Sequence, residues 1–81
     1  MKLTDSDSGI EYYFIRNPNY ILIDAHVIEC DQRFGDIARI YDYTGLNPQL
    51  SVPRRLGFKA IKFIMANYLS AVKEMQYARP E

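Results

Sequence analysis

The residues best suited to metal binding or acid–base chemistry gather in one short segment: Asp24, His26, Glu29, Cys30 and Asp31. A histidine and a cysteine with this spacing would meet on a helix, but the segment alternates apolar and polar residues as a strand does. On a strand, His26 and Cys30 would lie more than about 10 Å apart. One histidine and one cysteine also fall short of the ligand set of a zinc site. We therefore expect no metal and no cofactor.

The common catalytic motifs are missing from the sequence. It has no G-x-S-x-G nucleophile elbow, no P-loop and no G-x-G-x-x-G dinucleotide motif. A reactive pair of Cys30 and His26 would need the two side chains to touch, and a hairpin strand holds them apart. Asp24 with Glu29 or Asp31 would make a carboxylate pair, but nothing in the sequence marks either as buried. We therefore expect that the protein is not an enzyme.

Four cations lie at the start of the longest helical pattern of the chain: Arg54, Arg55, Lys59 and Lys62. A helix capped by Ser51 and starting at Pro53 would place cations near the positive end of its dipole, which costs about 0.3–1 kcal/mol each. In one interpretation, acids of the N-terminal half offset these charges. In the other, the cations and the free N–H groups of the helix start form an anion-binding surface. Phe63 lies on this face, away from the apolar stripe, as a contact aromatic does.

We expect the partner to bind these four cations and Phe63, with Tyr12 and Tyr43 as further contacts, because tyrosine combines an apolar body with a polar tip. The charge distribution agrees with an anionic partner. Eight acids face four bases up to Leu50, whereas six bases face two acids from Ser51 onward, although the net charge is zero. The two halves could equally attract each other within one fold.

Length and composition describe an ordinary globular domain. The chain has 81 residues, and this length is too short for a large core. Of these residues 48% are hydrophobic and 25% are charged, a composition that argues against disorder. Cys30 is the only cysteine, so no disulfide can form within the chain. The sequence shows no leader-like apolar run at its N-terminus and no stretch of about 18 apolar residues. We expect a soluble protein of the cytoplasm that has no membrane contact.

An antiparallel hairpin is the clearest local prediction. Residues 10–16 are rich in aromatic and β-branched residues, and residues 20–30 alternate with Ile21, Ile23, Ala25 and Val27 on one face. The Asn-Pro-Asn sequence at 17–19 is typical of a tight turn. Residues 1–9 are polar, and we expect a mobile tail there.

The remaining elements are predicted as helices. Residues 31–46 fit a helix capped by Asp31 and ended by Gly45, with a third strand as the open alternative. Residues 53–77 fit a long helix, unless Gly57 separates its first turn. Its apolar stripe is predicted from helical spacing: Phe58, Ile61, Met65, Tyr68, Leu69, Val72 and Met75.

These elements predict an α+β fold in which residues 10–81 form one domain, with the hairpin packed against the C-terminal helix. We expect a non-enzymatic protein-binding module, a regulator or inhibitor that occupies an acidic surface on a larger partner, as small proteins of phages and mobile elements do. A nucleic-acid-binding regulator that uses the same basic face is the alternative. The helix-turn-helix pattern, however, fits poorly, because Tyr41 stands where a small residue is needed. A homodimer would also cover the aromatic surface.

Overall fold

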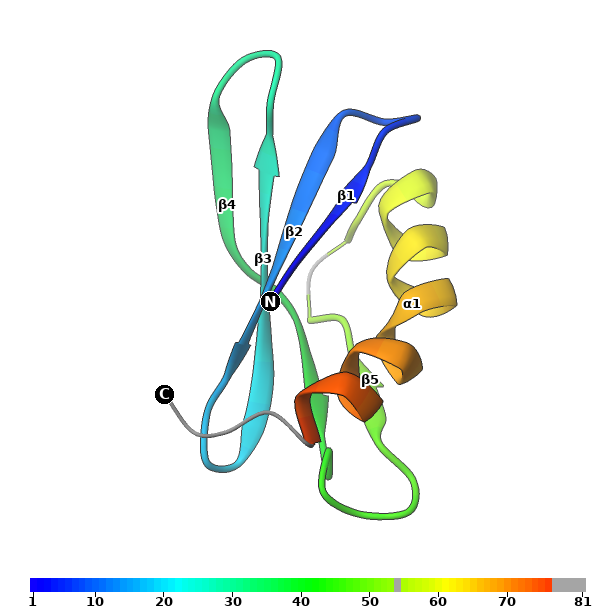
Figure 1. The fold of residues 1–81 in the computed structure, drawn as a ribbon. Coiled ribbons are helices and arrows are strands. Elements are labelled where there is room, and N and C mark those ends of the chain that lie inside the picture. The colour runs from blue at the N-terminus through cyan, green and yellow to red at the C-terminus, as the bar shows by residue number, and fades with distance from the viewer. Residues whose placement is uncertain (54, 77–81) are drawn as a thin grey trace.

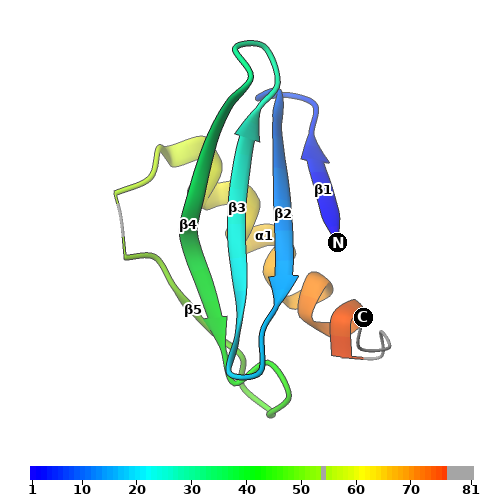
Figure 2. The same ribbon diagram turned by 90° about the vertical axis from the view of Figure 1, so that its left-hand side faces the viewer.

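The computed structural model describes residues 1–53 and 55–76, which form one antiparallel sheet and one helix (Figure 1). The five strands neighbour one another in chain order: β1 (Lys2–Asp5), β2 (Ile10–Arg16), β3 (Tyr20–Val27), β4 (Gln32–Tyr41) and β5 (Gln49–Ser51). Helix α1 (Phe58–Gln76) lies across one face of the sheet, and the other face is uncovered (Figure 2). The predicted α+β fold is confirmed, with five strands in place of two or three.

The predicted hairpin is the centre of the sheet. Strands β2 and β3 pair over seven positions, from Ile10 opposite Val27 to Arg16 opposite Ile21. The backbone N–H of Asn17 donates to the carbonyl of Tyr20 at 2.8 Å, which closes the turn. The residues of β3 with odd numbers from 21 to 25 are buried beneath α1, as the alternation predicts.

The prediction of a polar tail at residues 1–9 is wrong for its first part. Lys2–Asp5 forms strand β1, which pairs with β2 from Lys2 opposite Tyr13 to Asp5 opposite Ile10. The turn that follows is held by the Asp5 carboxylate, which accepts from the Ser8 hydroxyl at 2.8 Å. Leu3, the apolar residue of this strand, packs against the core. One apolar residue on an edge strand gives too weak a period-2 pattern to be seen in the sequence.

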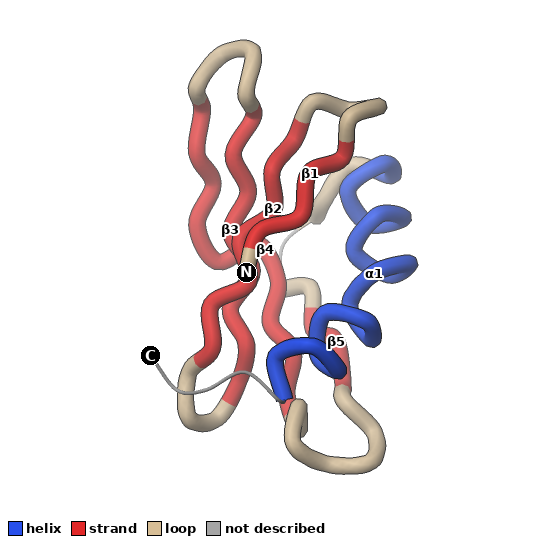
Figure 3. The backbone as a smooth tube through the Cα atoms, in the orientation of Figure 1, coloured by secondary structure: helices blue, strands red, loops and turns tan. Residues whose placement is uncertain are grey.

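The prediction of a helix over residues 31–46 is also wrong, and its strand alternative is right. Gln32–Tyr41 is β4, the longest strand of the sheet (Figure 3). A bulge shifts its register against β3 between Ile23 and Ala25. The bulge contains Asp36 at a φ of 52°, and its backbone N–H donates to the Asp24 carboxylate at 2.7 Å.

Helix α1 begins at Phe58, later than the predicted start at Pro53, and ends at Gln76. Ser51 belongs to β5 and does not cap the helix. The side that packs on the sheet is centred on four buried residues: Ile64, Ala71, Val72 and Met75. Phe63 is half-buried on this side, and its ring stacks on the buried ring of Tyr12 with centroids 4.8 Å apart. Of the predicted apolar stripe, Phe58, Met65 and Leu69 are exposed instead.

Candidate protein-interaction surface

The side of α1 that faces away from the sheet carries three large apolar residues. Phe58, Met65 and Leu69 are exposed to 79%, 61% and 55%. Their spacings of seven and four residues place them in one row along the helix. We call this row the apolar ridge. Single exposed apolar residues are ordinary, but an exposed row of this kind is typical of a contact surface.

Lysines run beside the apolar ridge. Lys59, Lys62 and Lys73 are exposed on the same side of α1, and helical spacing puts Lys62 four residues after Phe58 and Lys73 four residues after Leu69. We call them the basic flank. Within residues 1–53 and 55–76, none of the three forms an ion pair with a carboxylate. The exposed side of α1 is therefore apolar along one edge, beside the buried residues, and cationic next to it.

Only part of the predicted contact set lies on this surface. Lys59 and Lys62 belong to the basic flank, and Arg55 is exposed in the segment before α1. Arg54 lies outside the described residues. The ring of Phe63 is turned toward the sheet, away from the position beside the two lysines that the sequence predicts. Because α1 starts after Arg55, the predicted anion site at the helix start does not form as expected.

The two tyrosines of the predicted contact set are core residues. Tyr12 is fully buried in β2, and Tyr43 is 8% exposed after β4. The Tyr43 hydroxyl donates to the carbonyl of Asn17 at 2.6 Å. These side chains hold the fold together and do not reach a partner in this conformation.

The apolar ridge was missed because apolar residues occupy most of the circumference of α1. A helix of this kind offers more than one apolar stripe, and spacing alone does not say which one the sheet covers. The alanines at positions 60 and 71 mark the side close to the sheet, but the exposed Ala66 shows that alanine positions alone do not identify this side. Ala71 is fully buried and Ala60 packs against the core, as expected where a helix lies close to a sheet.

The residues with acid–base potential meet on the uncovered sheet face. His26 Nδ1 lies 2.9 Å from Glu11 Oε1, and His26 Nε2 lies 2.6 Å from Asp31 Oδ1. Lys2 Nζ is 3.1 Å from the other oxygen of Glu11. We call these four residues the His26 cluster. A carboxylate only accepts hydrogen bonds, so both contacts are hydrogen bonds when both ring nitrogens donate, as they do in the protonated imidazole.

The hydrogen bonds of the His26 cluster shift the pKa values of His26 and Glu11 in opposite directions. The hydrogen bonds to Glu11 and Asp31 raise the pKa of His26, against a smaller opposing effect of burial and of the nearby Arg33. The hydrogen bond from His26, followed by that from Lys2, lowers the pKa of Glu11. Cys30 is not part of this cluster, because its thiol donates to the side chain of Gln32 at 3.9 Å.

Because its folded-state pKa is raised, His26 stabilises the fold fully below its unfolded pKa of about 6.5. We expect this contribution to be lost as the pH rises through the higher folded-state value. Glu11, whose pKa is lowered, contributes above its unfolded value, and this is lost as the pH falls through the folded one. Urea unfolding of the wild type and of His26→Gln, at pH values from below about 6.5 to above the raised pKa of His26, measures how the contribution of His26 to stability changes with pH. If the difference in free energy of unfolding between the two proteins does not change with pH, His26 is not held as an imidazolium by two hydrogen bonds.

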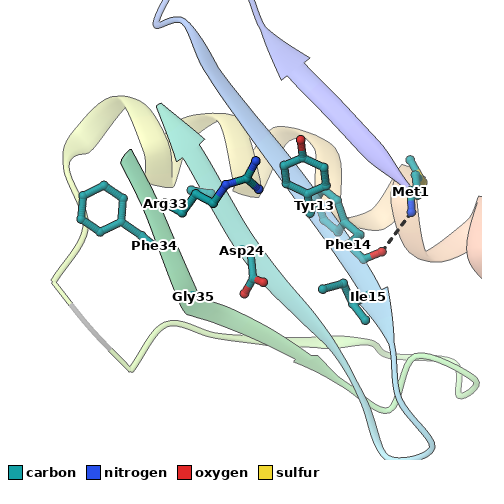
Figure 4. Close-up of a pocket in the computed structure, with 9 residues that line it drawn as sticks. Met1, Tyr13, Phe14, Ile15, Asp24, Arg33, Phe34 and Gly35 are labelled. Carbon is teal, nitrogen blue, oxygen red and sulfur yellow. Dashed lines mark hydrogen bonds between the residues drawn. The ribbon is translucent and has the colours of Figure 1, made fainter. Parts of the chain in front are cut away.

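The uncovered face also has a hollow of about 330 Å³ beside the bulge of β4. Figure 4 shows Tyr13, Asp24 and Arg33 around it, with Ile15 at one side. One carboxylate oxygen of Asp24 accepts from the backbone of Asp36. Among the described residues, no group of three or more His, Cys, Asp and Glu side chains is placed to hold a metal ion.

The chain was compared with known protein families, proteins and structures. None of the protein-family models, curated proteins and solved structures compared with the chain matches it. In the described part of the chain, no helix combines the length and the apolar character needed to cross a membrane. Among the surfaces described above, the outer side of α1 has the strongest features of a binding site.

Proposed function

We propose that this protein is a non-enzymatic protein-binding module, a regulator or inhibitor that acts by covering a surface on a larger partner. The observation that supports the proposal is the apolar ridge with its basic flank on the outer side of α1. An amphipathic helix binds a groove through anchors at helical spacing, and the three residues of the ridge have that spacing.

The charges on α1 define the chemistry of the partner. The basic flank has no carboxylate partner in the described part of the chain, and Glu74 is the only acid of α1. A groove with apolar walls and acidic residues along its rim would match both the ridge and the flank. Complementary charge speeds association and excludes wrong partners, while the buried apolar residues supply most of the affinity.

Leu69→Ser tests this proposal, because it removes an apolar anchor without changing charge. We expect it to weaken binding to the partner at least about 10-fold, as loss of an interface anchor does. Leu46→Ser is the matched control, since Leu46 is 99% exposed but lies in the loop between β4 and β5. Immobilised wild type and both variants are incubated with lysate of the cells that produce the protein, and the bound proteins are quantified. The affinity of each variant for the purified partner is then measured by calorimetry.

A partner that binds Leu69→Ser as tightly as the wild type would place the binding surface elsewhere. If Leu46→Ser weakens binding of the partner as much as Leu69→Ser does, the loss of binding comes from the leucine-to-serine change itself and not from the position of Leu69 on α1.

Nucleic acid is the second candidate partner, because the basic flank and Arg55 are free to contact phosphates. Its test is an anisotropy titration of a generic DNA duplex at about 50 mM and about 200 mM salt, between which released counterions weaken binding steeply. Here Lys62→Ser is expected to weaken binding for all sequences alike, and Leu69→Ser to leave it unchanged. No binding of the duplex by the folded wild type at either salt concentration would favour the protein partner.

A further inference from the structure

The uncovered face of the sheet carries a second group of exposed and half-exposed apolar and aromatic side chains, on the side away from α1. Figure 2 looks onto this face, with α1 behind the strands. Five side chains form what we call the open-face patch: Ile15, Tyr20, Leu22, Arg39 and Tyr41. Cross-strand pairing brings them together, because Leu22 lies opposite both Ile15 and Arg39, and Tyr20 lies opposite Tyr41. Ile15 and Tyr41 are exposed to 44% and 39%.

The only charged group of the open-face patch is already neutralised within the chain. The Arg39 guanidinium donates two hydrogen bonds to the Asp36 carboxylate, at 2.9 and 2.7 Å. The same guanidinium lies over the Tyr20 ring, 4.6 Å from its centroid. A bidentate pair of this kind neutralises the charge of the guanidinium, and a further N–H of Arg39 donates to the Tyr41 hydroxyl at 3.5 Å. A partner that covers the patch therefore needs no carboxylate of its own.

These charges distinguish the two surfaces. A copy of the chain placed on the outer side of α1 would bring one basic flank against another, which is repulsive. A copy placed on the open-face patch would bring neutral ion pairs, tyrosines and aliphatic residues together. Tyrosine and arginine are enriched in the centres of interfaces, where lysine is depleted. The open-face patch, which contains no lysine, therefore fits a second copy of this chain.

The dimensions of the molecule allow such an interface on the sheet. A standard interface covers about 800 Å² of each partner, roughly a seventh of the 5773 Å² surface of the chain. The molecule measures 35 × 25 × 19 Å, so an area of this size extends from the open-face patch over the rest of the uncovered sheet face, including the His26 cluster with its internally paired charges.

We propose that two copies of this protein associate through their open-face patches, with the two sheets packed face to face about a two-fold axis. In such an interface each patch contacts the same patch of the other copy. This association leaves the outer side of α1 free in both copies, so it does not depend on the proposed function.

Sedimentation equilibrium of the full chain over a range of concentrations tests the proposal. We expect the mass to rise with concentration from the 9.5 kDa of one chain toward twice that value. Ile15→Glu places an unpaired carboxylate in the interface, and we expect it to raise the dissociation constant at least about 10-fold. Tyr41→Lys adds a charge at a second exposed position and should act in the same direction. Leu69→Glu is the control, since Leu69 is exposed on the opposite side of the molecule.

Circular dichroism establishes which variants are folded, and the comparison is made among those. A wild type that keeps the mass of one chain at every concentration would overturn the proposal. So would a dimer that Leu69→Glu weakens as strongly as Ile15→Glu, because the copies would then meet through α1. A dimer weakened by the two sheet variants and not by Leu69→Glu supports it.

Discussion

Replacing Phe63 with alanine is expected to lower the free energy of unfolding by roughly 2–3 kcal/mol. The cost for a fully buried phenylalanine is about 3–5 kcal/mol, and Phe63 is only half-buried. Its ring nevertheless stacks on Tyr12, with an angle of 16° between the ring planes. Truncation therefore opens a gap between α1 and β2 and removes an aromatic contact that stabilises beyond its buried area. Urea denaturation monitored by far-UV circular dichroism measures the change.

Phe58→Ala is the matched control for this prediction. It is the same substitution on the same helix, but the Phe58 side chain is 79% exposed and is not part of the core cluster. We expect its effect on stability to stay within about 0.5 kcal/mol. If the two substitutions change the free energy of unfolding equally, the packing of the Phe63 ring between α1 and the sheet does not stabilise the fold. The two variants also separate stability from binding, because Phe58 belongs to the apolar ridge.

The central hairpin could be predicted from the sequence because its pattern is local. Alternation in residues 20–27 and the turn at Asn17 are properties of the strand and of the loop themselves. Strand β4 could not be predicted with the same certainty, because the bulge at Asp36 interrupts its alternation. In the sequence, Ile37, Arg39 and Tyr41 fall on one face of a regular strand. In the structure Ile37 is buried at the bulge, whereas Arg39 and Tyr41 lie on the open face.

The site was harder to predict than the fold. The sequence identifies Lys59 and Lys62 as surface cations, which follows from the high cost of burying an unpaired ammonium. It does not fix the rotation of α1, because that depends on packing against strands distant in the sequence. If α1 is rotated wrongly about its axis, Phe58 is assigned to the core and Phe63 to the contact surface, which is the reverse of the structure.

The two buried tyrosines are expected to respond in opposite ways to loss of their hydroxyl groups. Tyr12 Oη is buried and has no hydrogen-bond partner among the described residues. Burial, with a smaller effect of the Asp5 charge, raises the pKa of this hydroxyl. Tyr12→Phe removes an unsatisfied polar group, and we expect it to stabilise the protein by about 1 kcal/mol.

Tyr43→Phe makes the same chemical change where the hydroxyl is satisfied. It removes the hydrogen bond to the carbonyl of Asn17, which is 2.6 Å long and ties the end of β4 to the β2–β3 turn. Because the carbonyl then loses its partner in a partly buried place, we expect a loss of about 1–3 kcal/mol. The two variants are compared by urea denaturation under one set of conditions. If Tyr12→Phe destabilises the protein as much as Tyr43→Phe does, the Tyr12 hydroxyl has a partner in solution. A water molecule bound beneath α1 would be the simplest such partner, since buried waters usually satisfy otherwise unpaired polar groups.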